Sequence, residues 1–128
     1  MDVPSFHDGR FDGFWIGADE AVHLFLRTQG GKRFTLILRG VERLILSEIK
    51  EGNIIFDLVF RDSRQLTTSD MDELYDIKAH SHQAASLLEK AREKGLRALE
   101  INPSYGAFAL FLFQTSEIRE TNPLPTPD

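Results

Sequence analysis

The stretch VHLFLRTQGGKRFTLILR, residues 22–39, decides the fold class of this chain. On each side of Gly30 and Gly31, large apolar residues recur at every second position, the period of a half-buried β-strand. The two glycines supply the positive φ angles that a tight turn demands. The stretch therefore predicts an antiparallel β-hairpin.

Further strands are predicted on both sides of this hairpin. The whole region from residue 11 to 61 has strand-like patterning, and Glu51-Gly52-Asn53 marks a second hairpin turn before a strand at 54–61. Two more strands are expected at 96–101 and 107–115, joined by a turn that contains a proline and a glycine. The pattern predicts an antiparallel meander sheet of six or seven strands.

One main helix is predicted between the two groups of strands. Residues 62–79 are polar and acidic, with helix-capping residues and a short helical turn near 71–74. The clearest helix covers residues 81–94 and ends at Gly95. Its apolar stripe consists of Ala84, Leu87, Leu88 and Ala91. The fold class is therefore α+β, with the helix packed on one face of the sheet.

Length and composition limit the classes of protein to consider. The chain has 128 residues, of which 41% are apolar and 27% charged, as in one globular domain, which we place at residues 1–120. Residues 121–128 contain three prolines and read as a flexible tail. The chain has no cysteine, which excludes disulfides and thiolate metal sites.

Charge and hydropathy bear on compartment and partners. No apolar run approaches the roughly 20 residues of a membrane helix, and the first residues lack a signal-peptide pattern. The net charge is −5, and neither half of the chain has the positive excess that phosphate binding requires. We expect a cytoplasmic protein that binds neither membranes nor nucleic acids.

The strands carry apolar residues on both faces. Phe25, Ile37 and Val59 are out of phase with the main apolar set, and Phe111 lies in a strand that is apolar on both sides. One helix cannot cover both faces of such a sheet. Three alternatives follow: the sheet curls and buries both faces, it binds a second copy or another protein, or it holds a small apolar ligand. Trp15 and Tyr105 are candidates either for the core or for an interface.

Four residues form a candidate ligand cluster: His7, Asp8, Asp12 and His80. A carboxylate that orients a histidine would make it a general base. The alternative is that Asp8-Gly9 simply forms a turn before the first strand. His80 and His82 would point about 200° apart on a helix, so we predict no metal site and no cofactor.

An acidic run lies before the main helix. Asp70, Asp72, Glu73 and Asp76 lack the central glycine of a calcium-binding loop. The run is therefore either a solvated edge of the protein or an electrostatic contact for a basic partner.

Two short motifs carry a resemblance to known proteins. Phe6-His7-Asp8-Gly9 precedes the first hairpins, and Leu99-Glu100-Ile101-Asn102-Pro103-Ser104-Tyr105-Gly106-Ala107 links two strands near the end. Over residues 6–113 the chain resembles small bacterial α+β proteins that are either grouped with the immunity proteins of polymorphic toxin systems or left uncharacterised. The resemblance implies no catalytic residue and no cofactor. It implies a protein that binds and neutralises a toxin.

These observations lead to one leading expectation and two alternatives. The leading one is a non-enzymatic protein-binding module of the immunity type. Its contact residues would be the apolar Phe25, Ile37, Val59 and Phe111 and the acidic Asp70, Asp72, Glu73 and Asp76. The alternatives are a small-ligand-binding protein or enzyme that uses the cluster of His7, Asp8 and Asp12, and a homo-oligomeric structural domain such as a homodimer.

Overall fold

The computed structural model of the protein describes residues 3–121. The strands are β1 (Arg10–Ile16), β2 (Val22–Arg27), β3 (Arg33–Arg39), β4 (Arg43–Ser47), β5 (Asn53–Arg61), β6 (Arg97–Tyr105), β7 (Phe108–Phe113) and β8 (Thr115–Glu120). A short 3-10 helix, Ser63–Gln65, and two α-helices, α1 (Thr68–Tyr75) and α2 (His82–Glu93), lie between β5 and β6. The helices described here are thus one insertion between two neighbouring strands.

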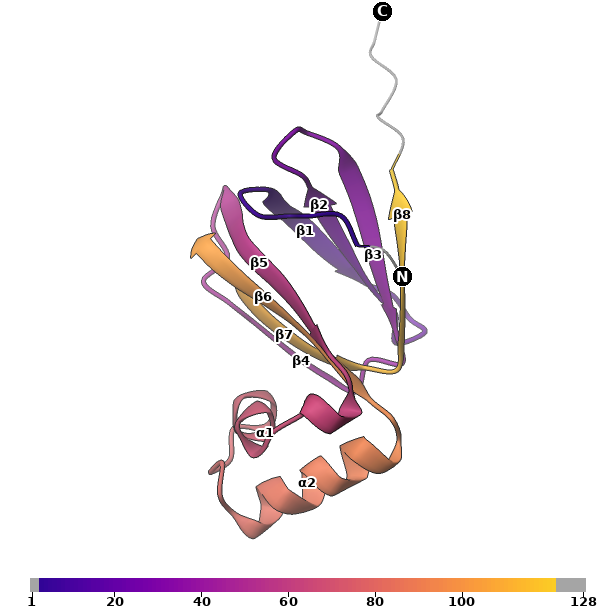
Figure 1. Ribbon diagram of the computed structural model, residues 1–128, viewed down its shortest axis with the longest axis vertical. Coiled ribbons are helices and arrows are strands. Elements are labelled where there is room, and N and C mark those ends of the chain that lie inside the picture. The colour runs from indigo at the N-terminus through magenta and orange to yellow at the C-terminus, as the bar shows by residue number, and fades with distance from the viewer. Residues whose placement is uncertain (1–2, 122–128) are drawn as a thin grey trace, which may run out of the picture.

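The eight strands form one antiparallel sheet in the order β4-β7-β6-β5-β1-β2-β3-β8. The sheet curls so that two halves face each other: the helix-covered half, β4-β7-β6-β5, and the open half, β1-β2-β3-β8 (Figure 1). The halves join where β1 pairs with β5 through Arg10 with Ile54 and Phe11 with Asn53. Beyond this short junction β1 continues beside β2, so the halves separate and enclose a core.

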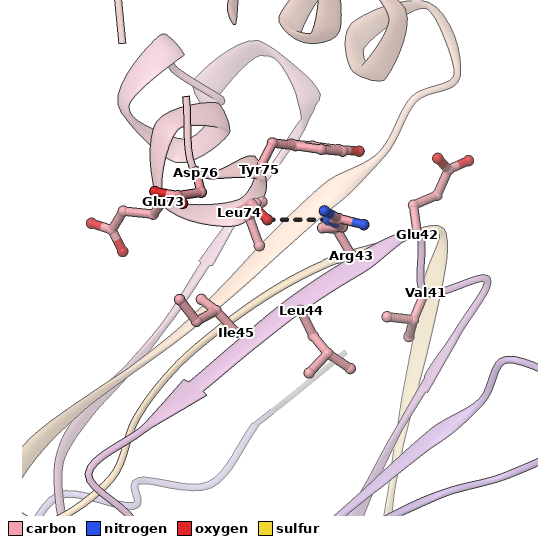
Figure 2. A pocket seen from close by; sticks show the side chains of 9 residues that line it. All are labelled: Val41, Glu42, Arg43, Leu44, Ile45, Glu73, Leu74, Tyr75 and Asp76. Atoms are coloured by element: carbon pink, nitrogen blue, oxygen red, sulfur yellow. Dashed lines mark hydrogen bonds between the residues drawn. The ribbon is translucent and has the colours of Figure 1, made fainter. Parts of the chain in front are cut away.

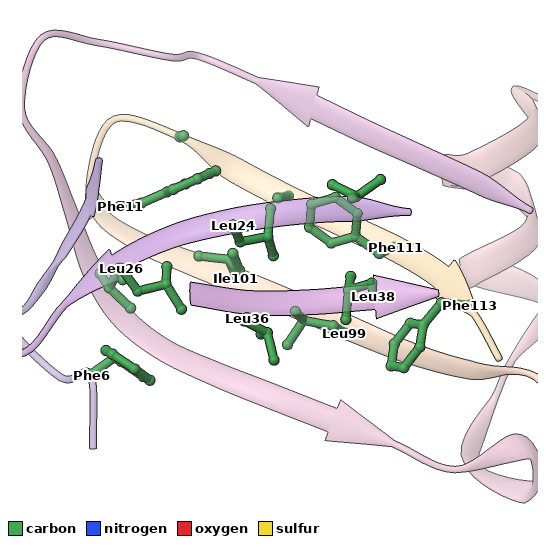
Figure 3. Close-up of a cluster of buried hydrophobic side chains, with 14 residues drawn as sticks. Phe6, Phe11, Leu24, Leu26, Leu36, Leu38, Leu99, Ile101, Phe111 and Phe113 are labelled. Atoms are coloured by element: carbon green, nitrogen blue, oxygen red, sulfur yellow. The ribbon is translucent and has the colours of Figure 1, made fainter. Parts of the chain in front are cut away.

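The main core lies between the two halves. Figure 3 shows that leucines of β2 and β3 meet side chains of β6 and β7 there. The core residues come from alternate positions of each strand, as the period of two requires. Phe6, from the segment before β1, joins this core and packs edge to face on Phe34, with 5.7 Å between ring centroids. The curl therefore buries the inner face of the sheet.

A second core lies on the outer face of the helix-covered half. There α1 and α2 bury outward side chains of β6 and β7 (Figure 1). Leu110 and Leu112 of β7 are each 1% exposed under the helices, while Phe111 between them belongs to the main core. Strand β7 is buried on both faces, which accounts for its uninterrupted apolar sequence, FALFLF.

A buried asparagine ties the junction between the halves to two turns. The amide nitrogen of Asn53 donates to the backbone oxygens of Phe11 and Lys50 at 3.3 and 3.0 Å. Its oxygen accepts from the backbone N–H groups of Lys50 and Ala107 at 2.8 and 3.0 Å. Gly106 beside it has φ +89°, and a Cβ there would lie 2.4 Å from Asn53 Oδ1. Asn53 thus joins three segments that are distant in sequence.

The architecture confirms the predicted α+β class with an antiparallel sheet and corrects its details. The sheet has eight strands instead of six or seven, and two α-helices stand where one main helix was predicted. The missed strand is β8, whose sequence TSEIRE offers one large apolar residue, Ile118, because β8 is an edge strand with a wet outer face. The order is not a meander, since β4 and β8 lie at the edges, away from the strands that precede them.

Two other predictions concern the ends of the chain and membranes. Of the proline-rich tail predicted at 121–128, all but Thr121 lies outside the described residues. Within residues 3–121 no helix has the length and apolar character needed to cross a membrane.

Candidate functional site

The outer face of the open half carries no helix in the described part of the chain (Figure 1). The strand register places Trp15 opposite His23 and His23 opposite Ile37, and it places Phe25 opposite Thr35 in the next row. These side chains share one face because alternate residues of a strand point to the same side. We call them the Trp15 surface: Trp15, His23, Phe25, Thr35 and Ile37.

The Trp15 surface exposes large rings beside a buried aliphatic residue. Trp15 is 60% exposed and Phe25 is 39% exposed, whereas Ile37 is 4% exposed. The rings of Trp15 and His23 lie 5.1 Å apart between centroids, at 40° to each other. Trp15 and Phe25 are diagonal neighbours on adjacent strands, close enough for contact with one partner. Exposed aromatic residues of this kind are typical of protein interfaces.

Charged side chains surround the Trp15 surface on the same face. Its arginines are Arg10, Arg27, Arg33, Arg39 and Arg119, and its carboxylates are Asp12 and Glu117. Five cations against two anions give this face a net charge of +3 in a chain whose net charge is −5. Two nitrogens of Arg27 donate to Asp12 at 2.6 and 2.8 Å. Hydrogen bonds from Arg39, and then from Arg119, lower the pKa of Glu117.

The helix-covered half has a mostly acidic outer face. The guanidinium of Arg61 donates twice to the buried carboxylate of Asp70, both at 2.7 Å, and once to Glu100 at 3.4 Å. Asn102 donates to Glu100 at 3.0 Å and to Asp57 at 2.8 Å. Arg61 therefore pairs with two carboxylates, and Asn102 links one of them, Glu100, to Asp57.

Glu73 of α1 lies beside this network, and the charges of the network shift its pKa. Burial, and then the carboxylates of Glu100, Asp70 and Asp72, raise the pKa of Glu73 above its usual value. Arg61 opposes this shift only in part. The carboxylates on this half thus repel one another, in contrast to Glu117, which arginines stabilise.

A groove of about 600 Å³ lies between β4 and the end of α1 (Figure 2). Residues 41–45 form one wall and residues 73–76 form the other, and we call this the β4 groove. Arg43 Nε donates to the backbone oxygen of Leu74 at 3.1 Å, and its guanidinium lies 4.7 Å from the centroid of the Tyr75 ring. These contacts fix the last turn of α1 over the start of β4.

The structure separates the contact residues that the sequence grouped together. Phe25 and Ile37 lie on the open half, whereas Val59 lies on β5 opposite Glu100. Phe111 is fully buried in the main core, so it is not available to a partner. The acidic residues Asp70, Asp72, Glu73 and Asp76 belong to α1 or its C-terminal cap, on the helix-covered half, and Asp70 is buried. A single surface containing all eight residues does not exist.

The candidate ligand cluster is not brought together either. His7 bonds through Nδ1 to the backbone oxygen of Phe56 at 2.8 Å, and its Nε2 lies 3.5 Å from Asp8 Oδ2. Asp12 is held by Arg27 on the open half. His80 lies in the connection between α1 and α2, at the end of the molecule away from the segment before β1 (Figure 1). Residues 3–121 contain no group of three or more His, Asp or Glu side chains placed to hold a metal ion.

The sequence left open whether Trp15 belongs to the core or to an interface. The arginines that surround the Trp15 surface were not predicted as part of a site. The structure places Trp15 on the surface because β1 leaves the junction with β5 after Phe11 and its outer side faces no helix. These arginines could have been found from the sequence, because Arg27, Arg33 and Arg39 fall at outward positions of the predicted hairpin at residues 22–39.

Searches of this chain against protein-family models, curated protein sequences and solved structures find no match. The geometry of these surfaces is therefore the basis for inferring the function of the chain.

Proposed function

We propose that this protein is a non-enzymatic protein-binding module that acts by stoichiometric contact through the Trp15 surface. The observation that supports it is the 60% exposed ring of Trp15, next to Phe25, on a sheet face that the described chain leaves uncovered. Tryptophan is strongly enriched among residues that dominate binding energy. Large contiguous apolar patches on the surface of a protein mark sites of interaction with a partner.

The charge around this surface points to the chemistry of the partner. The net charge of +3 on the outer face of the open half favours a partner with an acidic surface, because complementary charge speeds encounter and suppresses wrong partners. This revises the partner chemistry expected from the acidic run. Those carboxylates lie on the other half, so they take no part in contact through the Trp15 surface.

The resemblance to immunity proteins makes the proposal more specific, because it suggests what kind of protein the partner is. In that form the partner is a toxin domain, and the module neutralises it by covering its active site or its target-binding surface. The support for this form is the pair of short motifs at residues 6–9 and 99–107. Mixing purified chain with a candidate toxin domain and measuring residual toxin activity against molar ratio tests it. Inhibition should be complete near one equivalent.

The general proposal is tested by two matched double variants. Trp15→Ser with Phe25→Ser alters the Trp15 surface, and Ile49→Ser with Phe56→Ser removes two side chains of similar exposure elsewhere, 53% and 52%. Tagged wild-type and variant proteins capture partners from the same lysate, and quantitative mass spectrometry compares them. We expect a near-stoichiometric partner that the wild type and the control retain and the first variant loses. Equal recovery by all three proteins would contradict the proposal.

A second copy of the chain is the alternative partner for the Trp15 surface. A homodimer through the Trp15 surface would form in purified protein alone, and the Trp15→Ser, Phe25→Ser variant would be monomeric. Native mass spectrometry over a range of protein concentrations separates the two cases. A wild-type dimer that this variant abolishes would assign the surface to a second copy instead of a foreign partner.

A further inference from the structure

Strand β4 is an edge of the sheet with a free side. Among the strands of residues 3–121 it pairs only with β7, so alternate backbone N–H and C=O groups along its other side face away from the sheet. Its sequence, RLILS, is rich in β-forming apolar residues. Leu44 and Leu46 point toward the main core and Ile45 points toward the helices. Such an edge is a template onto which an extended peptide adds as a further strand.

The β4 groove lies along this edge, with α1 as its second wall. Figure 2 shows Glu73 and Asp76 at the end of α1, above β4. Asp76 ends the helix with φ 54°, and its backbone N–H donates to the oxygen of Asp72. Because Arg43 ties this helix end to β4, the groove is formed before any ligand arrives.

The positive charges beside the groove are already engaged by other groups. Glu42 is paired with Lys94 at 2.9 Å, and Arg43, the groove's own cation, is engaged with the Leu74 oxygen and the Tyr75 ring. Neither Glu73 nor Asp76 forms an ion pair within residues 3–121. Burial, and then the carboxylates of Glu100, Asp70 and Asp72, raise the pKa of Glu73, and Arg61 offsets this shift only in part. A cation placed here would relieve this repulsion.

We propose that the β4 groove binds an extended peptide segment with lysine or arginine at alternate positions, which pairs with the free edge of β4. Every second residue of the added strand would lie on the side of α1, within reach of Glu73 and Asp76. The intervening residues would continue the apolar row of Leu44 and Leu46. This site is separate from the Trp15 surface and takes a partner of opposite charge.

The test uses the full chain and a fluorescein-labelled peptide, (Val-Arg)₃ with blocked ends. Glu73→Gln with Asp76→Asn removes the two wall charges, and asparagine tolerates the left-handed φ of position 76. Glu89→Gln with Glu93→Gln makes the same charge change on exposed positions of α2 and is the control. Fluorescence anisotropy gives the affinities, and backbone amide NMR shifts locate the peptide.

We expect the peptide to bind the wild type and the control within twofold of each other, and the wall variant to bind it roughly tenfold more weakly. The amide shifts should concentrate on β4, and N-methylation of those alternate peptide amides that face β4 should abolish binding. Trp15→Ser should leave the affinity unchanged, so failure of this proposal is distinct from failure of the Trp15 surface.

Four results of the peptide experiments would overturn the proposal. They are absence of binding at millimolar peptide, equal affinity for the wall variant, equal affinity for a (Val-Glu)₃ peptide, and amide shifts away from β4. Pairing of β4 with β4 of a second copy would also overturn it. Native mass spectrometry would then show a dimer of the wild type that a peptide does not displace.

Discussion

Strand β7 and the β1–β2 pair have apolar residues on both faces, yet their outer faces have opposite environments. The outer residues Leu110 and Leu112 of β7 are each 1% exposed, whereas Trp15 and Phe25 are 60% and 39% exposed. The difference arises from chain connectivity, because both helices are inserted between β5 and β6 and pack on the half that contains these strands. A strand that is apolar on both faces therefore indicates burial only where the chain supplies a cover.

The two halves also differ in how they treat charge. On the helix-covered half Arg61 lies among three carboxylates, those of Asp70, Glu100 and Glu73. On the open half arginines outnumber carboxylates, and Glu117 lies between two of them. The two halves thus differ in whether helices cover the outer face and in the sign of the charge on that face. Three pairs of substitutions compare the halves directly.

The largest expected effect compares a phenylalanine from each environment. Phe111→Ala should lower the free energy of unfolding by about 3–5 kcal/mol, because it opens a cavity in the main core. Phe25→Ala should cost less than about 1 kcal/mol, because its ring is partly in water already. Urea unfolding followed by circular dichroism measures both. Similar losses for the two variants would mean that the outer face of the open half is covered.

The next comparison uses two bidentate ion pairs, one in each half. Arg61 and Asp70 have side chains 18% and 7% exposed, against 37% and 35% for Arg27 and Asp12. Asp70→Ala should cost about 3 kcal/mol, because it leaves a guanidinium in a poorly solvated site. Asp12→Ala should cost no more than about 1 kcal/mol. Double-mutant cycles in each pair isolate the pairing energies, and equal coupling in both would refute the contrast in burial.

The smallest effect is a pH dependence of opposite sign. Glu73 has a raised pKa in the folded state, so its ionisation destabilises the protein as pH rises through the carboxyl range. Glu117 has a lowered pKa, so it contributes stability above its unfolded pKa, near 4.3, and loses it as pH falls through the folded pKa. Glu73→Gln should therefore melt slightly above the wild type at pH 7, and Glu117→Gln slightly below it.

Melting curves between pH 3 and pH 8 check these signs. For Glu73→Gln the difference from the wild type should vanish near pH 3, where the wild-type carboxyl is protonated in both states. For Glu117→Gln the difference should shrink over the same interval. The same sign for both variants at pH 7 would show that the two halves do not differ in electrostatic environment.

Much of the secondary structure was predictable, because it depends on local patterns. The hairpin at residues 22–39, the strands around the last turn and the helix over 81–94 follow from apolar periodicity and from turn and cap residues. Strand β8 was not predictable in this way, since its pairing with β3 joins segments about 80 residues apart and its own sequence is mostly polar. The curl was one of three alternatives, because alternation shows that both faces are apolar but not what covers them.

The candidate site was less predictable than the fold. Phe25 and Phe111 looked alike in sequence, but a neighbouring half covers only Phe111. His7 and Asp12 are close in sequence and have different partners in the structure, Phe56 and Arg27. Such assignments depend on where β1 leaves β5, a long-range contact that no local pattern encodes.

The most direct test of partner binding through the Trp15 surface is the quenching of Trp15 fluorescence by acrylamide. Trp15 is the single tryptophan of the chain, so its emission reports the proposed binding surface alone. We expect efficient quenching in the free monomer and several-fold weaker quenching in the complex with the captured partner. Equal quenching in the free protein and the complex would contradict the claim that this face of the sheet binds the partner.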